Sequence, residues 1–175
     1  MQILETEHLK LLPFTLELKK TLVADRALFA EKIGVQVPDS WPGPDLADAL
    51  SFFIKVMEND PTGRVWDGII IHTADQVAIG SIGFHGEPDE AGALELGYSN
   101  IPQYRGRGYA TEMAQSIIDW AFRTQRIEAI VAECLDDNIG SIKVLERVGM
   151  QRLAPDGNML KWRLQALKER IGAEK

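Results

Sequence analysis

The stretch Gln103-Tyr104-Arg105-Gly106-Arg107-Gly108-Tyr109-Ala110 decides the fold class expected of this chain. It lies between a run typical of a β-strand and the strongest helical pattern in the sequence. Because glycine has no Cβ, the backbone at Gly106 and Gly108 can approach a ligand closely. The amides and the positive dipole end of a helix N-terminus suit a phosphate or a diphosphate. The stretch therefore predicts an anion site, to which Arg105 and Arg107 add positive charge.

Several types of loop are candidates for the stretch Gln103 to Ala110, hereafter the glycine loop. The simplest alternative is a tight turn with solvated arginines. A Walker A loop is excluded, because no Gly-Lys-Ser/Thr follows. The dinucleotide-binding fingerprint fits only in part, since Thr111 occupies its third glycine position and little chain remains for a full dinucleotide fold. A further alternative is a diphosphate loop of the kind found in acyl-CoA enzymes, which depends on the resemblance described below.

The chain after the loop alternates between helical and strand patterns. Apolar residues at helical spacing predict a helix over Tyr109 to Thr124. A buried strand is predicted over Ile127 to Cys134 and a helix over Asn138 to Val148, which ends at Gly149. A last strand is expected near Met159 to Leu164.

The N-terminal half begins with a short strand and two helices. The strand is predicted over His8 to Phe14, and one helix over about Leu16 to Lys32. The proline-rich segment Val37 to Pro44 excludes regular helix and predicts a surface loop before a helix over about Leu46 to Glu58. Within this loop, Trp41 is a candidate wall of a substrate pocket, although an aromatic anchor for the loop is the favoured interpretation.

Three β-rich runs precede the glycine loop, at about Val65 to His72, Val77 to Phe84 and Ala93 to Ile101. Turn-forming clusters separate them, which favours an antiparallel meander. The predicted order is β-α-α-β-β-β-α-β-α-β. With no repeat and no long linker, residues 1–175 are expected to form a single domain.

Composition limits the partners of the protein. Hydrophobic residues make up 45% and charged residues 26%, as in an average globular protein. The formal net charge of -7 argues against a nucleic-acid partner and favours a cationic or amine substrate. No apolar run approaches the length of a membrane span, and the N-terminal sequence is not that of a signal peptide. We expect a cytoplasmic protein that does not bind membranes.

Metal binding is not indicated by the sequence. Cys134 is the only cysteine, so an internal disulfide and a multi-cysteine site are both excluded. The three histidines, His8, His72 and His85, lie too far apart for a local ligand pair. We therefore expect no structural metal.

Two motifs carry a resemblance to a known family. Gln103-x-x-Gly106-x-Gly108 resembles the Gln/Arg-x-x-Gly-x-Gly/Ala signature of the GNAT N-acetyltransferase superfamily. The segment Asn138 to Met150 is similar to that family's Asn-x-x-Ser/Ala…Glu-Lys/Arg-x-Gly-Phe helix. The similarity covers about Val77 to Leu164 and is strongest to the branch of ribosomal-protein N-terminal acetyltransferases.

The resemblance implies both a fold and a cosubstrate. The fold is an α/β (α+β) fold with a mixed, mostly antiparallel sheet, helices on both faces, and a parallel pair formed by Ala93 to Ile101 and Ile127 to Cys134 that splays apart. Acetyl-CoA would bind with its diphosphate on the glycine loop and its pantetheine arm in the wedge between these strands. The implied binding residues are Ile101, Gln103, Arg105, Gly106, Arg107, Gly108, Tyr109, Ala110, Asn138 and Ser141.

The resemblance also suggests catalytic groups. Glu95 occupies the position at which several members carry the general base, acting here through a water; a solvated or ion-paired strand carboxylate is the alternative. Many members carry a tyrosine acid where this chain has Leu145, so that acid is excluded. Ser141 is the substitute suggested by the ribosomal-protein branch, although contact with CoA suits an unassisted hydroxyl better than proton donation.

Other side chains are weaker candidates. Tyr98 and His85 could face the acceptor, although packing or strand-end roles are the simpler interpretation for each. Cys134 is expected to behave as a small buried hydrophobe, and no adjacent base would activate it. Direct attack of the amine on the thioester is therefore preferred over an acyl-cysteine intermediate.

The function expected from these features is transfer of an acetyl group from acetyl-CoA to a primary amine, on a protein N-terminus or a small molecule. The alternatives are a catalytically silent acyl-CoA sensor and, less favoured, a dinucleotide-binding oxidoreductase. Family resemblance alone suggests a homodimer. The identity of the acceptor is not encoded in any motif, because fold analogy names no substrate.

Overall fold

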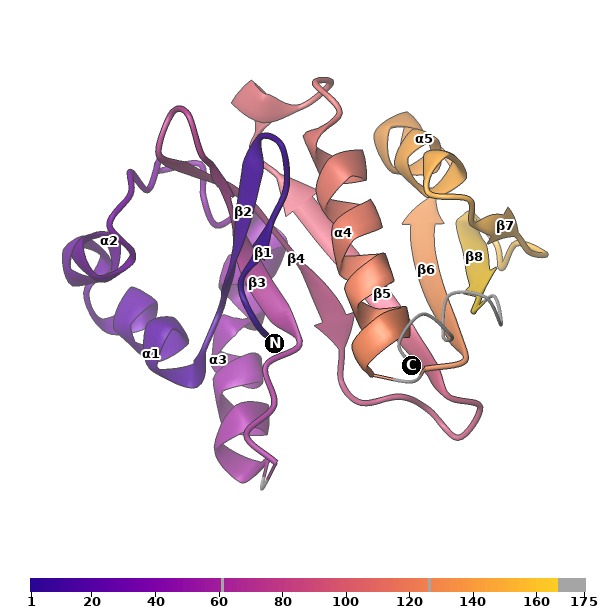
Figure 1. The fold of residues 1–175 in the computed structure, drawn as a ribbon, viewed down its shortest axis with the longest axis horizontal. Helices are drawn as coiled ribbons and strands as arrows, with labels where there is room; N and C mark the ends of the chain where they lie inside the picture. The colour runs from indigo at the N-terminus through magenta and orange to yellow at the C-terminus, as the bar shows by residue number, and fades with distance from the viewer. Residues whose placement is uncertain (61, 126, 167–175) are drawn as a thin grey trace, which may run out of the picture. The chain divides into compact units, whose positions relative to one another are not determined.

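The computed structural model describes residues 1–60, 62–125 and 127–166 (Figure 1). The expected domain of residues 1–175 therefore ends in a segment, 167–175, that lies outside the described residues. Within the described part, helices and strands follow one another along the chain as follows: β1 (Leu4–Glu5), β2 (Leu9–Pro13), α1 (Leu16–Ala24), α2 (Arg26–Ile33), α3 (Pro44–Asn59), β3 (Asp67–His72), β4 (Val77–His85), β5 (Ala93–Asn100), the 3₁₀ turn η1 (Pro102–Tyr104), α4 (Tyr109–Thr124), β6 (Ala129–Leu135), α5 (Ile139–Arg147), β7 (Gln151–Arg152) and β8 (Met159–Gln165).

The strands form a mixed sheet in the order β1-β2-β3-β4-β5-β6-β8-β7. The β2–β3, β6–β8 and β7–β8 pairs are antiparallel, whereas β5 and β6 run parallel. This arrangement confirms the predicted fold class, a mostly antiparallel sheet with one parallel pair. The short strands β1 and β7 were not predicted, since two residues are too few to show a period.

The chain divides into two compact units. Unit 1 contains residues 1–82 and 98–107, and unit 2 contains residues 83–97 together with the chain from 108 onward. The boundary falls inside β4 and β5 and again between Arg107 and Gly108. Each unit is therefore built from segments that are separated in the sequence.

Unit 1 has an aromatic core beside the β2–β3 pair. The buried rings of Phe14, Phe29 and Trp41 contact one another, and Phe29 and Trp41 stack with centroids 5.6 Å apart. Lys19 is buried next to them, where its Nζ donates to the Phe14 carbonyl and, at 2.8 Å, to Asp67 Oδ1. Desolvation lowers the pKa of Lys19, while the Asp67 carboxylate raises it.

The single helix predicted over Leu16 to Lys32 is wrong, because two helices occupy this span. The backbone of Asp25 is extended, with φ -154° and ψ 101°, and ends α1. Its side chain then caps α2 by accepting a hydrogen bond of 3.0 Å from the Leu28 N–H. Aspartate is a preferred N-cap residue, so a signal for this break was present in the sequence and was overlooked.

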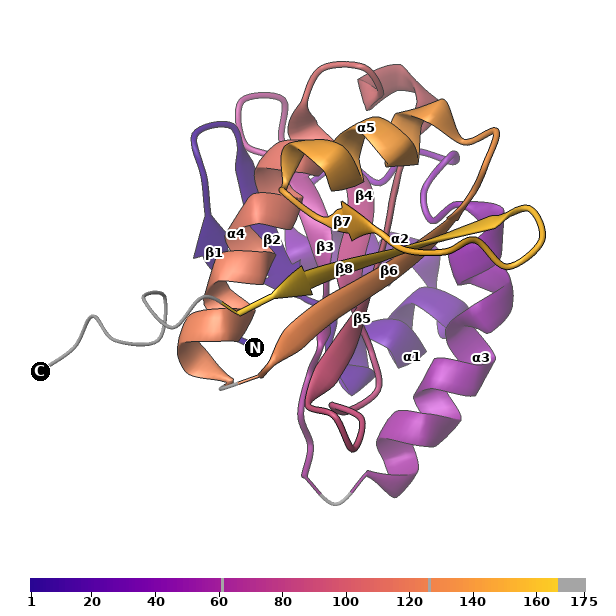
Figure 2. The same cartoon turned by 90° about the vertical axis from the view of Figure 1, so that its right-hand side faces the viewer.

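Unit 2 follows its sequence pattern closely. Helix α4 has the predicted bounds, Tyr109 to Thr124, and buries the apolar face that defined it. Strand β6 pairs with β8 along its whole length, from Ala129 to Leu135. Helix α5 packs against α4 and β6 (Figure 2). The chain leaves α5 at Gly149, whose φ of +85° is one that glycine adopts without strain.

Candidate active site

The glycine loop links the end of β5 to the start of α4. Ile101 fixes its beginning, because this residue is buried and its N–H donates to the Ile79 carbonyl at 2.8 Å. Gly106 and Gly108 have φ values of +73° and +86°, which side-chain-bearing residues rarely adopt. Gly108 is the N-cap of α4, and as a glycine it has no side chain with which to cap the helix. The helix N-terminus is thus suited to accept an external anion.

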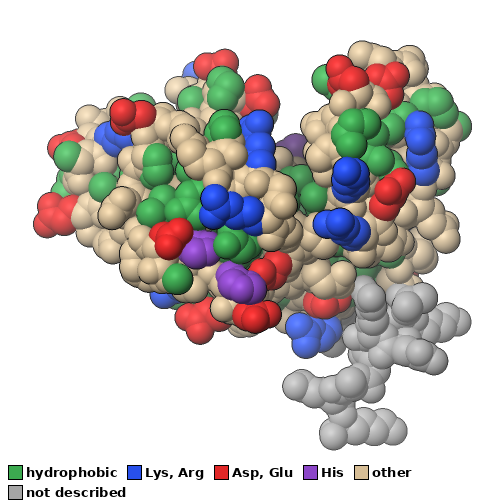
Figure 3. Space-filling model, turned by 90° about the horizontal axis from the view of Figure 1, so that it is seen from above, with side chains coloured by type: hydrophobic (Ala, Val, Ile, Leu, Met, Phe, Trp, Pro, Cys, Tyr) green, Lys and Arg blue, Asp and Glu red, His purple; other side chains and the backbone are tan. Residues whose placement is uncertain are grey.

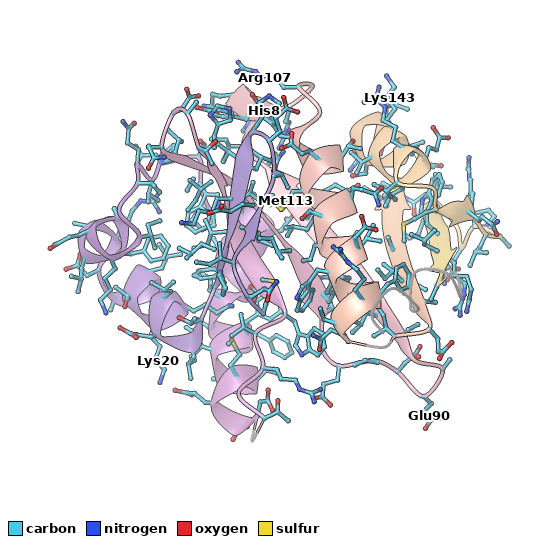
Figure 4. All side chains as sticks on the ribbon, viewed as in Figure 1. His8, Lys20, Glu90, Arg107, Met113 and Lys143 are labelled. Atoms are coloured by element: carbon cyan, nitrogen blue, oxygen red, sulfur yellow. The ribbon has the colours of Figure 1, made fainter. Side chains whose placement is uncertain are left out.

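The side chains of Arg105 and Arg107 are exposed, and each contacts a nearby residue. Arg105 Nε donates to the Asn100 carbonyl at 2.9 Å. The guanidinium of Arg107 lies over the ring of Tyr104, 5.3 Å from its centroid. Figure 4 shows Arg107 extending outward from the end of the molecule where the loop lies. Gln103 Oε1 accepts a long contact of 3.4 Å from Ser40 Oγ, so this side chain is held loosely.

The parallel pairing of β5 with β6 is short. It joins Ala93 to Ala129, Leu94 to Ile130 and Glu95 to Val131. In the part of the chain that the structure describes, the ladder ends there, although β6 continues to pair with β8 as far as Leu135. Loss of pairing beyond Glu95 is what a splayed pair of strands requires, and it leaves this glutamate at the last position of β5 that pairs with β6.

Glu95 has an imidazole as its neighbour. The Nδ1 of His85 lies 3.5 Å from Glu95 Oε1, and the two side chains are 54% and 46% exposed. Gly97 makes room for this ring, because a Cβ at that position would lie 2.7 Å from His85 Nε2. Glu95 and His85 thus form a solvent-accessible pair of proton-accepting groups. The importance of Gly97 was missed, since nothing local in the sequence shows which ring lies over it.

Helix α5 presents its N-terminus through Asn138. The Oδ1 of Asn138 accepts a hydrogen bond of 3.1 Å from the Ser141 N–H, which makes Asn138 the N-cap. Asn138 is exposed and Ser141 half-buried, so both can reach a ligand. Leu145, at the position of the family's tyrosine, is buried and apolar, and it offers no proton.

The other candidates differ in their surroundings. Trp41 is only 1% exposed, and its Nε1 donates to the Gly80 carbonyl at 3.0 Å and to Ser81 Oγ at 3.2 Å. This is the geometry of a loop anchor. Tyr98 is half-buried on β5. Cys134 is a buried free thiol, in keeping with the role of a small hydrophobe.

Neither a metal-binding cluster nor a membrane-spanning helix is present in the described residues 1–60, 62–125 and 127–166. They contain no group of three or more histidine, cysteine, aspartate or glutamate side chains arranged to hold a metal ion. Nor does any helix in these ranges have the length and apolar character needed to cross a membrane.

Comparison with known proteins identifies the class. The family model described as "Acetyltransferase (GNAT) domain" matches residues 8–151. An uncharacterized N-acetyltransferase of Bacillus subtilis (strain 168), YjdG, is 32% identical over 150 residues, which span 85% of this chain and 89% of that protein. The chain therefore belongs to the GNAT acetyltransferase family, and it is an N-acetyltransferase. Membership of this family argues against a dinucleotide-binding oxidoreductase.

Solved structures share the fold. The ribosomal-protein-S5-alanine acetyltransferase of Vibrio fischeri superposes with a TM-score of 0.67 at 16% identity, covering 96% of this chain and 98% of that one. The microcin C7 self-immunity acetyltransferase MccE, in complex with acetyl-CoA and AMP, gives a TM-score of 0.62 at 18% identity, covering 91% and 93%. Acetyl-CoA is thus bound by a relative of the same fold.

Proposed function

We propose that this enzyme transfers the acetyl group of acetyl-CoA directly to a primary amine, with Glu95 as the general base. The observation that carries this proposal is the Glu95–His85 pair, in which Nδ1 and Oε1 are 3.5 Å apart and both side chains reach solvent. A carboxylate beside an imidazole can accept a proton from an ammonium group or from a bridging water. No metal is required for this step.

The donor is held, in this proposal, by main-chain groups. The diphosphate of acetyl-CoA lies on the amides of residues 105–110, where the positive φ of Gly106 and Gly108 keeps the approach open. Arg105 and Arg107 add charge-assisted contacts at the rim. The backbone near Ile101, together with Asn138 and Ser141, binds the pantetheine arm.

In this proposal the reaction proceeds without a covalent acyl-enzyme intermediate. The amine nitrogen attacks the thioester carbonyl carbon and forms a tetrahedral intermediate. Glu95 accepts the nitrogen's proton through a water, the C–S bond breaks, and CoA leaves as a thiolate that takes up a proton from solvent water. Ser141 contacts the departing sulfur, since Leu145 replaces the tyrosine that would otherwise donate. Cys134 takes no part, because its thiol is buried.

The acceptor is an amine on a protein N-terminus or on a small molecule. The acidic balance of the chain, with a net charge of -7, favours a cationic acceptor. His85 and Tyr98 are proposed to contact it. Trp41 is left out of these contacts, because it is buried in unit 1 as a loop anchor.

The test is release of free CoA thiol from acetyl-CoA in the presence of a panel of amines. The panel contains peptides with free N-termini, the same peptides with blocked N-termini, and small primary amines. Thiol release that requires a free amine, with acetylated product seen by mass spectrometry, supports the proposal. Tight CoA binding without release from any amine would contradict it and favour an acyl-CoA sensor.

A further inference from the structure

Tyr104 is the half-buried residue of the stretch 102–108, whose other residues are exposed. Its hydroxyl donates a hydrogen bond of 2.7 Å to Asp75 Oδ2, in the turn between β3 and β4. The bond joins residues that lie 29 positions apart, so it ties the loop to a separate segment of unit 1.

The partner of Tyr104 is itself fixed in place. The Asp75 N–H donates to Nδ1 of His72 at 3.2 Å, and the Asp75 carboxylate lies 3.2 Å from the same nitrogen. The imidazole of His72 is buried, and its ring centroid lies 5.5 Å from that of Tyr104. Figure 3 looks down on this end of the strands, where histidine, acidic and basic side chains gather in a small area.

The ring of Tyr104 also contacts the charged side chain of Arg107 in the loop. The guanidinium of Arg107 lies over the face of the Tyr104 ring, 5.3 Å from its centroid, at a distance typical of a cation–π contact. The position of Tyr104 therefore influences both the backbone around Gly106 and the place of the Arg107 charge. A loop containing two positive-φ glycines has little stiffness of its own, so such a contact can decide its conformation.

We propose that Tyr104 and Asp75 are positioning residues that hold the glycine loop in the conformation that binds the CoA diphosphate. The proposal rests on the proposed function of this loop. Neither residue touches the reacting atoms; they reduce the ordering that the loop would otherwise undergo when the ligand binds. Their contribution is therefore expected in the affinity for CoA and in the KM for acetyl-CoA, whereas kcat stays unchanged.

The experiment compares two donors in the wild type and in Tyr104→Phe. This variant removes only the hydroxyl and keeps the ring that contacts His72 and Arg107. We expect the Kd for CoA and the KM for acetyl-CoA to rise about three- to tenfold, the value of one hydrogen bond. The KM for S-acetylpantetheine, which lacks the diphosphate, should stay the same. A general loss of structure would affect both donors.

The partner and a matched control complete the test. Asp75→Ala should weaken CoA binding at least as much as Tyr104→Phe does, because it removes the same hydrogen bond together with the contact of the carboxylate with His72. The double variant should lose little more than Asp75→Ala alone, since both changes remove the Tyr104–Asp75 hydrogen bond. Thr73→Val is the control, since it removes an exposed hydrogen bond of 2.8 Å from the same turn to the His8 carbonyl and does not affect Tyr104. It should leave the CoA affinity unchanged.

Failure of the positioning role and failure of the loop's proposed function would give different results. If the wild type binds CoA and Tyr104→Phe binds it equally well, or if both donors weaken together, the positioning role is wrong. If the wild-type enzyme binds neither CoA nor acetyl-CoA, the proposed function of the loop is wrong.

Discussion

The Nδ1 of His85 lies 3.5 Å from the Oε1 of Glu95, where the parallel pairing of β5 with β6 ends. Glu95 is therefore neither a solitary strand carboxylate nor a buried ion pair. The ring of His85 lies over Gly97, which follows Glu95 by two residues along β5. Residues two apart on a strand point to the same side, so the carboxylate of Glu95, the imidazole of His85 and Gly97 lie on one face of the sheet.

Replacing the carboxylate tests the base directly. Glu95→Gln keeps the shape of the side chain and removes its ability to accept a proton. We expect kcat for an amine acceptor to fall by about 10² or more, with the KM for acetyl-CoA unchanged, since general-base catalysis contributes on this scale. Thiol release with an amine acceptor measures this loss. Unchanged turnover would remove Glu95 from this role.

Gly97→Ala tests the imidazole without altering it. A Cβ at position 97 would lie 2.7 Å from His85 Nε2 and 3.0 Å from its Cε1, so the ring must leave its present position beside Glu95. We expect kcat to fall, the melting temperature to change little, and His85→Ala to cause no further loss in the double variant. Gly43→Ala is the control, because nothing lies within 4 Å of that added Cβ. If Gly97→Ala retains full activity, the ring position does not matter for catalysis.

The binding role of the glycine loop can be tested with two alanine variants that introduce similar backbone strain. Gly108 and Gly34 both have positive φ, +86° and +70°, with no atom within 4 Å of an added Cβ. Alanine at either position should cost about 1–2 kcal/mol of stability from backbone strain alone. Only Gly108→Ala should also weaken CoA binding in a calorimetric titration. Equal CoA affinity in the two variants would argue against the loop as the diphosphate site.

Asn138 combines a cap with a proposed ligand contact, and two substitutions separate the roles. Aspartate is as good an N-cap as asparagine, so Asn138→Asp should keep the stability and lose the amide donor. We expect its KM for acetyl-CoA to rise about threefold or more. Asn138→Ala should lose about 0.5–2 kcal/mol of stability as well. An Asp variant with wild-type KM would show that Asn138 acts only as a cap.

Lys19 predicts how stability changes with pH. Burial lowers its pKa in the folded protein below the ordinary value of 10.5, so the unfolded chain binds more protons in the window just below 10.5. The free energy of unfolding should therefore gain a positive contribution as pH rises through this window. Lys19→Met lacks that contribution, so the stability of the wild type relative to the variant should increase with pH. Parallel curves from denaturant unfolding would contradict this.

Much of the local structure could be predicted because its causes are local. The bounds of α4 follow from one apolar face at helical spacing, and the loop before it follows from glycines at positive φ. The N-cap at Asn138 is equally local, since its Oδ1 reaches only as far as Ser141. The break at Asp25 was of the same kind, and a capping signal for it was present.

The sequence by itself thus determined most of the helices and strands, the order of the motifs and the family to which the chain belongs. Only the tertiary structure decided which distant side chains meet: Glu95 with His85, Tyr104 with Asp75, and Trp41 with Gly80. The physical reason is the separation in sequence over which each interaction acts. A helical period or a cap is set within a few residues, whereas contacts between distant segments depend on how strands pair and how loops pack, which no short stretch of sequence encodes.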